Sequence, residues 1–285
     1  MKYSASDDIK FVTACLGISY SQLADCLNVA RSTINRIVDG KINPSNDFLE
    51  KLYSFVYTNN YFPLDINRMK IDFDLEYIGK ILFHGAKEDI DGDIDLKHSR
   101  TDIDVGRGFY LGDNYEQAAS YIYMNKKSSV YLFNADRLNE LKIKEFDVSL
   151  EWMLMVSYYR EQLEDYKDSP VIRKIIEEVE SVDVVIAPIA DNNIYEIMNN
   201  FARGVITDAQ ASRALSASHL GKQYVLKTDK ACQTIVPFDC LYLCKLERDN
   251  IEKIRREASN KTKNESQSII ESLRRQGRYI EEILK

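Results

Sequence analysis

Apolar and polar residues follow a helical period in the first part of the chain. Up to about residue 58, apolar side chains recur every three to four positions, which predicts a run of short helices. The first predicted helix ends at Gly17, because glycine commonly closes a helix. The second opens at Ser19 with Gln22 three residues later, the spacing of a capping box. The fourth predicted helix starts with Pro44 near its first turn.

The stretch QLADCLNVARSTINRIVDGKINPS contains the second and third predicted helices and resembles the Xre/Cro-type helix-turn-helix. The similarity covers residues 7–58, within a predicted domain at residues 1–60. It implies that the outward face of the third helix reads the DNA major groove. Ala30 stands where that family usually has a capping serine or threonine. The residues expected to contact DNA are Arg31, Ser32, Thr33, Asn35 and Arg36.

The charges of this helical segment leave a second interpretation open. Its six basic residues are matched by six acidic residues, whereas a strong DNA binder usually carries an excess of positive charge. A small helical module for dimerisation or protein contact is therefore the alternative to DNA binding. Helix-turn-helix modules of this type also commonly bind palindromic sites as homodimers.

After a predicted linker at residues 61–75, the pattern changes to short apolar runs bounded by glycine or polar turns. Strands are predicted at YIGKILFHG, GRGFYLG, SSVYLFNA, VDVVIAPIA, KQYVLKT and DCLYLCKL. Helical patterns separate some of them, at NYEQAASYIYMN, SLEWMLMVSYYREQLED and IYEIMNNFARG. Strands interspersed with helices predict an α+β domain over residues 76–248. Residues 249–285 form a charged helical extension whose thin apolar stripe fits either a packing arm or a tail.

Composition narrows the class of protein. A length of 285 residues suggests about two domains, and a net charge of −7 argues against nonspecific coating of nucleic acid. The five cysteines show no paired spacing, which argues against a zinc site, and free thiols fit a cytoplasmic location. No apolar run approaches the ~18 residues that cross a bilayer, so no membrane partner is expected.

Two glycine-containing motifs predict a pocket for a planar amide. His84 and Gly85 follow an apolar run directly, and a second apolar run follows Gly108. Glycine permits close approach of the backbone to another group. Tyr110 and Tyr121 offer aromatic faces on a strand and on the helix after it. Nicotinamide suits such a slot, because it stacks on tyrosine and its carboxamide bonds to exposed backbone.

The residues of these motifs also match known families. LFHGA followed by GRGFYLGDNYEQAASYI resembles the first two motifs of the diphtheria-toxin-like ADP-ribosyltransferases, which include the poly(ADP-ribose) polymerases. The span 79–238 resembles the bacterial DUF3990 family, which has counterparts in the same order of DLKHSRTDIDVGRGFYL, EWMLMVSYYR, VDVVIAPIADNNIYEIM and GKQYVLKT. The resemblance implies a split β-sheet ADP-ribosyltransferase-like domain that takes NAD as substrate and needs no metal.

The resemblance assigns roles to individual residues. His84 would hydrogen-bond the nicotinamide-side ribose of NAD, and the backbone of Gly85 would bind the carboxamide. Tyr110 and Tyr121 would sandwich the nicotinamide ring. Gln223 occupies the place of the superfamily's catalytic glutamate, which gives a His-Tyr-Gln set of catalytic residues.

Glutamine at this place keeps a hydrogen bond to the ribose but lacks the negative charge and the base. Glu151, Asp104 and Asp191 are carboxylates in the matched blocks that could supply the charge, and the sequence does not place them. Arg100 is a candidate contact for the NAD diphosphate.

These features predict a mono-ADP-ribosyltransferase that acts on a protein or nucleic-acid acceptor. By analogy, it would serve as a bacterial toxin, defence or regulatory factor, with a cognate antitoxin as a further partner. The alternative is a DNA-binding transcriptional regulator whose degenerate transferase domain senses NAD without turnover. Hydrolysis of NAD with water as acceptor is a third hypothesis.

Overall fold

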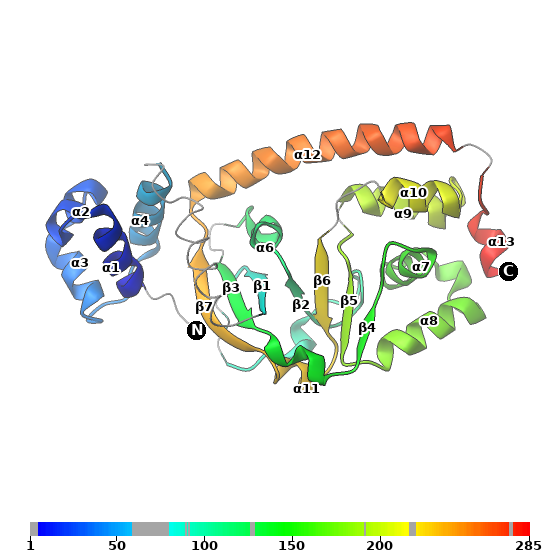
Figure 1. The fold of residues 1–285 in the computed structure, drawn as a ribbon, viewed down its shortest axis with the longest axis horizontal. Helices are drawn as coiled ribbons and strands as arrows, with labels where there is room; N and C mark the ends of the chain where they lie inside the picture. The colour runs from blue at the N-terminus through cyan, green and yellow to red at the C-terminus, as the bar shows by residue number, and fades with distance from the viewer. Residues whose placement is uncertain are drawn as a thin grey trace. The chain divides into compact units, whose positions relative to one another are not determined.

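The structure is a computed structural model that describes residues 5–58, 80–88, 90, 92–125, 129–190, 192–216, 221–273 and 276–285. It confirms the α+β class, with N-terminal helices, a mixed sheet with helices, and a C-terminal helical segment (Figure 1). The predicted linker at residues 61–75 lies outside the described residues. The chain divides into two compact units. The first comprises Met1–Gly92, Tyr115–Asn134 and Pro237–Lys253, and the second comprises Asp93–Asn114, Ala135–Val236 and Ile254–Lys285.

Four helices begin the first unit: α1 (Ala5–Leu16), α2 (Tyr20–Leu27), α3 (Arg31–Val38) and α4 (Asn46–Thr58). The capping box is confirmed, because Ser19 Oγ accepts from the Gln22 N–H and Gln22 Oε1 accepts from the Ser19 N–H. The start of α4 differs from the prediction. Ser45 caps it by accepting from the Phe48 N–H at 3.2 Å, so Pro44 precedes the cap.

Apolar side chains from all four helices form one core. Ile9, Leu23, Ile34 and Leu52 are fully buried in it, as their helical spacing requires. Tyr242, from a distant part of the chain, packs into the same core. The N-terminal helices are therefore part of the first unit's hydrophobic packing.

The first unit also contains three strands and a helix: β1 (Ile81–Ala86), β3 (Ser129–Asn134), β7 (Val236–Tyr242) and α6 (Tyr115–Ile122). β1 pairs antiparallel with β3, and His84 lies opposite Tyr131. Phe83 contacts Tyr115 of α6 edge to face, with ring centroids 6.3 Å apart. Because side chains alternate along a strand, His84 points to the face of β1 opposite α6.

Four strands belong to the second unit: β2 (Phe109–Gly112), β4 (Ile143–Glu145), β5 (Val184–Pro188) and β6 (Lys222–Leu226). β6 pairs antiparallel with both β2 and β5, and β4 pairs parallel with β5. The sequence predicted β2, β5 and β6 but missed β4. The strand order is β4-β5-β6-β2 within the second unit and β1-β3-β7 within the first.

Five helices of the second unit are α7 (Leu150–Tyr159), α8 (Pro170–Glu180), α9 (Asn192–Ala202), α10 (Asp208–Ser216) and α11 (Asp229–Cys232). Its short 3₁₀ turns are η1 (Leu96–His98), η2 (Asp136–Glu140) and η3 (Glu164–Tyr166). Trp152 of α7 is fully buried in the main core, as its helical spacing predicts. α8 and α10 were not predicted.

The C-terminal segment consists of α12 (Lys245–Ser272), which starts in the first unit, and α13 (Ile280–Leu284). Ile280 and Leu284 are buried in the core of the second unit, and Ile269 and Ile270 pack against it. Gln210 of α10 donates a 2.8 Å hydrogen bond to the Ile270 carbonyl. The end of the chain is a packing arm, one of the two forms that its apolar stripe allowed.

Candidate functional site

The motif residues of the first unit lie on β1 and α6. Gly85 faces α6 so closely that a Cβ there would lie 2.3 Å from the Ala118 carbonyl oxygen. The absence of a side chain therefore lets α6 pack on β1. Tyr121 on α6 is 59% exposed, whereas His84 is half-buried and points to the other face of β1. Within this unit, His84 and Tyr121 do not share a face of the strand.

In the second unit, the loop before β2 is tied to Tyr110. The Tyr110 hydroxyl accepts from the Val105 N–H at 3.1 Å and donates to the Gly106 carbonyl at 2.6 Å. Gly108 is also confined, since a Cβ there would lie 2.5 Å from Cγ1 of Val225. The close approach predicted at these glycines is thus made by the protein's own side chains. Tyr110 holds the loop in place through its hydroxyl.

The pairing of β2 with β6 brings Tyr110 and Gln223 onto one face. Tyr110 lies opposite Val225, and Gly112 lies opposite Gln223. Opposed residues of an antiparallel pair project to the same side, so Tyr110 and Gln223 are diagonal neighbours. Gln223 is almost completely buried, with 4% of its surface exposed.

Gln223 belongs to a buried polar cluster centred on Asp104. Its Nε2 donates to Oδ2 of Asp104 at 2.9 Å and to the Pro188 carbonyl at 3.0 Å. The Ala190 N–H donates to the same carboxylate oxygen at 3.1 Å. Arg160 donates to Oδ1 of Asp104 through Nε at 2.8 Å and through Nη2. Of the carboxylates that the sequence left unplaced, the structure puts Asp104 against Gln223.

Further contacts of this cluster hold the guanidinium of Arg160 in place. Its guanidinium reaches the Ala190 carbonyl at 2.9 Å and lies 4.9 Å from the ring centre of Tyr195. Only 21% of its side chain is exposed. Arg160 therefore forms a largely buried ion pair with Asp104.

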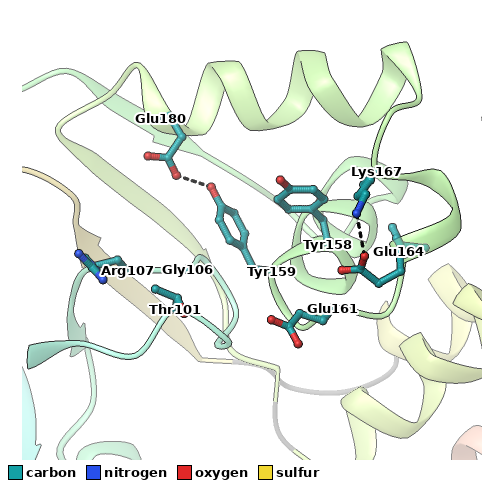
Figure 2. A pocket seen from close by; sticks show the side chains of 10 residues that line it. Thr101, Gly106, Arg107, Tyr158, Tyr159, Glu161, Glu164, Lys167 and Glu180 are labelled. Atoms are coloured by element: carbon teal, nitrogen blue, oxygen red, sulfur yellow. Dashed lines mark hydrogen bonds and ion pairs between the residues drawn. The ribbon is translucent and has the colours of Figure 1, made fainter. Parts of the chain in front are cut away.

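A pocket of about 370 Å³ lies beside the Gly106 turn (Figure 2). Tyr158 and Tyr159 supply its aromatic surface, and Arg107 its cation nearest to that turn. Gly106 has a φ of +68°, and a Cβ there would lie 2.5 Å from the Tyr159 ring. The other residues that line the pocket are Thr101, Glu161, Leu163, Glu164, Lys167 and Glu180.

A buried lysine supports the wall of this pocket. Lys227, with 5% of its side chain exposed, donates to the Val105 carbonyl at 2.8 Å and pairs with Glu180 at 3.1 Å. Burial lowers the pKa of Lys227, while the Glu180 carboxylate opposes that shift. Tyr159 donates to the same Glu180 at 2.5 Å, and burial raises its pKa far above the usual range. Sequence reasoning missed Lys227, which follows β6 as an ordinary strand-end lysine.

Two of the remaining candidates of the pocket prediction are paired with neighbouring charges. Arg100 forms a two-point ion pair with Asp102, at 2.9 and 2.6 Å. This pair raises the pKa of Arg100 and lowers that of Asp102. Glu151 pairs with Lys144 at 3.2 Å. Asp191 lies outside the described residues.

On α3, the predicted DNA-contacting residues are exposed or half-buried, while Ile34 and Ile37 are buried. Ala30 makes no side-chain capping bond at the start of the helix. Arg31 and Arg36 form no ion pair with the residues that the structure describes. By contrast, three lysines of the N-terminal segment pair with nearby carboxylates: Lys10 with Asp7, Lys41 with Asp39, and Lys51 with Asp47.

All five cysteines are free, and Cys232, Cys240 and Cys244 are buried. Among the described residues, no three His, Cys, Asp or Glu side chains gather in a way that could hold a metal ion. No helix in the described part of the chain has the length and apolar character to cross a membrane.

Comparison with protein families gives a match over the central part of the chain. A family described as "Protein of unknown function (DUF3990)" matches residues 80–236, more than half of the chain. Neither the curated proteins nor the solved structures include a match to this chain. The matched segment contains both glycine motifs and the Asp104 cluster.

Proposed function

The chain belongs to the DUF3990 family, and we propose that its matched domain is an NAD-dependent mono-ADP-ribosyltransferase. The reaction breaks the N-glycosidic bond of NAD and releases nicotinamide. It then joins C1′ of the ribose to a nucleophile on a protein or nucleic-acid acceptor, which gives up its proton. NAD is proposed as the substrate because LFHGA and GRGFYLG resemble the motifs of the NAD-dependent transferases.

One observation carries the proposal most directly: Tyr110 and Gln223 share a face of the β2–β6 pair. In the proposed reaction, Tyr110 stacks on the nicotinamide and Gln223 accepts a hydrogen bond from a ribose hydroxyl. The two groups act on adjoining parts of one substrate, so they have to lie on the same side of the sheet. His84 would bind the ribose and Gly85 the carboxamide. Tyr121 lies on α6, on the other side of β1 from His84, so the proposal assigns the stacking to Tyr110 alone.

The transition state of this reaction carries positive charge on the ribose, and positioned acceptors stabilise such charge. Gln223 provides an acceptor without a negative charge. Slow transfer to an acceptor that needs no strong base therefore fits this chain better than rapid polymer formation.

The test follows both halves of NAD. Purified protein is incubated with a cell lysate and NAD labelled in the adenylate half, and both nicotinamide release and label on macromolecules are measured. We expect both in the wild-type protein and neither in His84→Ala or Tyr110→Ala. His98→Ala is the matched control, because His98 is exposed on η1 and should not affect turnover.

Each other outcome points to a named alternative. Nicotinamide release without labelled macromolecules would indicate a glycohydrolase. Binding of NAD without turnover, weakened by the same variants, would indicate a sensor domain. Absence of both binding and turnover would refute the proposal.

We also propose that α3 binds DNA, because Arg31 and Arg36 make no ion pair within the described part of the chain, whereas Lys10, Lys41 and Lys51 are each paired with a carboxylate. Two unpaired arginines on one exposed helix are suited to phosphate or guanine contacts. Gel-shift selection from random duplexes tests this, with Arg31→Glu/Arg36→Glu expected to abolish any shift. Lys10→Glu is the control, and an unchanged shift in the arginine variant would favour the protein-contact interpretation.

A further inference from the structure

We infer that Asp104 is a positioning residue that fixes the side-chain amide of Gln223, with its oxygen available to the NAD ribose. The inference rests on the proposed function and concerns the glutamine that stands in place of a glutamate. It is carried by the hydrogen bonds of the Asp104 cluster.

The amide of Gln223 has only one orientation that satisfies its neighbours. An amide nitrogen has two hydrogens, and those of Gln223 are taken by Asp104 Oδ2 and the Pro188 carbonyl. A flipped amide would place its oxygen against both acceptors. The carbonyl oxygen of Gln223 is therefore the group left to accept, and it accepts nothing from the part of the chain that the structure describes.

Asp104 has to be a carboxylate at this place. In the part of the chain that the structure describes, every group that hydrogen-bonds Asp104 is a donor: two guanidinium nitrogens of Arg160, the Ala190 N–H and the Gln223 amide. Only an ionised carboxylate accepts at both oxygens without offering a hydrogen of its own. An asparagine would turn one N–H group against other N–H donors.

The same cluster explains the glutamine. A glutamate at position 223 would bring a second carboxylate to within 2.9 Å of Asp104, in a site where 4% of each residue is exposed. Two like charges in contact and buried repel strongly. Asp104 and Gln223 thus form a matched acid–amide pair. Arg160 balances the charge of Asp104. The role of Asp104 is therefore to orient the Gln223 amide, and not to supply negative charge to the transition state.

The test exchanges the two groups. Asp104→Asn, Gln223→Glu and the double variant are compared for nicotinamide release, with kcat and KM for NAD measured separately. Unfolding in urea is followed for the same proteins. Both variants that carry the Gln223→Glu change lose the donor to Pro188, so each is the matched control of the other. Asp183→Asn is the control for losing a structural carboxylate, since Asp183 accepts from Lys142 and Thr228 away from this cluster.

We expect Asp104→Asn to lower kcat on the order of 100-fold, as loss of an oriented transition-state hydrogen bond does, with a small change in KM. Gln223→Glu should be impaired in both activity and stability. The double variant should recover activity at least about tenfold over Gln223→Glu, because an amide again faces a carboxylate. Asp183→Asn should lose stability and keep kcat.

Two results would overturn the inference. One is an Asp104→Asn protein with the wild-type kcat; the other is a double variant whose losses are the product of the two single losses. If Asp104→Asn does not fold, the comparison of Gln223→Glu with the double variant still decides. A wild-type protein that neither binds nor cleaves NAD refutes the proposed function instead, and the unfolding cycle then tests the pair by itself.

Discussion

The Tyr115 hydroxyl donates a 2.8 Å hydrogen bond to Oε1 of Glu247, a carboxylate buried in the first unit. Tyr115 begins α6, and Glu247 lies in the first turn of α12. Burial raises the pKa of Glu247 to about 7, although the bond from Tyr115 opposes the shift. The carboxyl group therefore titrates near neutral pH in the folded protein.

Stability should fall as pH rises through the range in which Glu247 ionises. An unburied glutamate has a pKa of 4.5, so between pH 4.5 and 7 the native state keeps a proton that the unfolded chain releases. The loss across this window corresponds to about 3 kcal/mol, and above pH 7 this group adds no further change. Urea unfolding between pH 4 and 8 measures it. Glu247→Gln should lack this part of the slope, and equal slopes would contradict the assignment.

Glu50 should be essential for holding α4 to the start of α12. Its Oε1 accepts from Tyr242 at 2.8 Å and from Arg248 at 3.0 Å, and its Oε2 accepts from the Lys245 N–H at 2.9 Å. Arg248 has 10% of its side chain exposed, so Glu50→Ala would take a carboxylate away from a nearly buried cation. We expect a loss of about 2 kcal/mol in the free energy of unfolding.

The matched control for Glu50 is Lys51→Ala. Lys51 pairs with Asp47 on the surface of the same helix, and such exposed pairs contribute about 0.5 kcal/mol or less. If both variants lose stability equally in urea, the Glu50 contacts are not the source of the stabilisation.

Local patterns predicted most of the elements whose residues are strongly periodic, with α8 as an exception. The capping box at Ser19 and the buried face of α3 follow from residues within one or two turns of each other. β4 was not predicted because its three residues, Ile143 to Glu145, are too few to show the alternation of a strand and are partly exposed. It forms through pairing with β5, about 40 residues further on. α8 had the apolar spacing of a helix and was overlooked.

The candidate site could be predicted only in part, because contacts between distant residues leave no local pattern in the sequence. The motifs identify Tyr110 and Gln223 by type and order, because each sits in a recognisable strand. Asp104 lies in an irregular loop with no periodic signal, and its partner Gln223 is 119 residues away. Its role depends on four converging donors, which only the folded chain brings together.

Gly106→Ala should destabilise the turn that carries the Tyr110 hydrogen bond. The new Cβ would lie 2.5 Å from the Tyr159 ring, at a φ of +68° that side chains rarely adopt. Crowding and backbone strain together should cost about 3 kcal/mol. Gly17→Ala is the control, because Gly17 has a φ of +63° and nothing within 4 Å, so strain alone should cost about 1 kcal/mol. If urea unfolding shows equal losses of stability in the two variants, the Tyr159 ring moves aside and crowding adds nothing to the backbone strain.

The two caps of the N-terminal helices should respond in opposite directions. Ala30 has the extended backbone of a cap, with φ −70° and ψ 137°, and supplies no side-chain acceptor to α3. Ala30→Ser provides one and should raise the free energy of unfolding by about 1 kcal/mol. Ser19→Ala removes the acceptor for the Gln22 N–H and should cost about the same. Thermal unfolding of the two variants checks both signs. If Ala30→Ser leaves the stability unchanged, the first turn of α3 is already satisfied by other groups, and the missing cap has no energetic consequence.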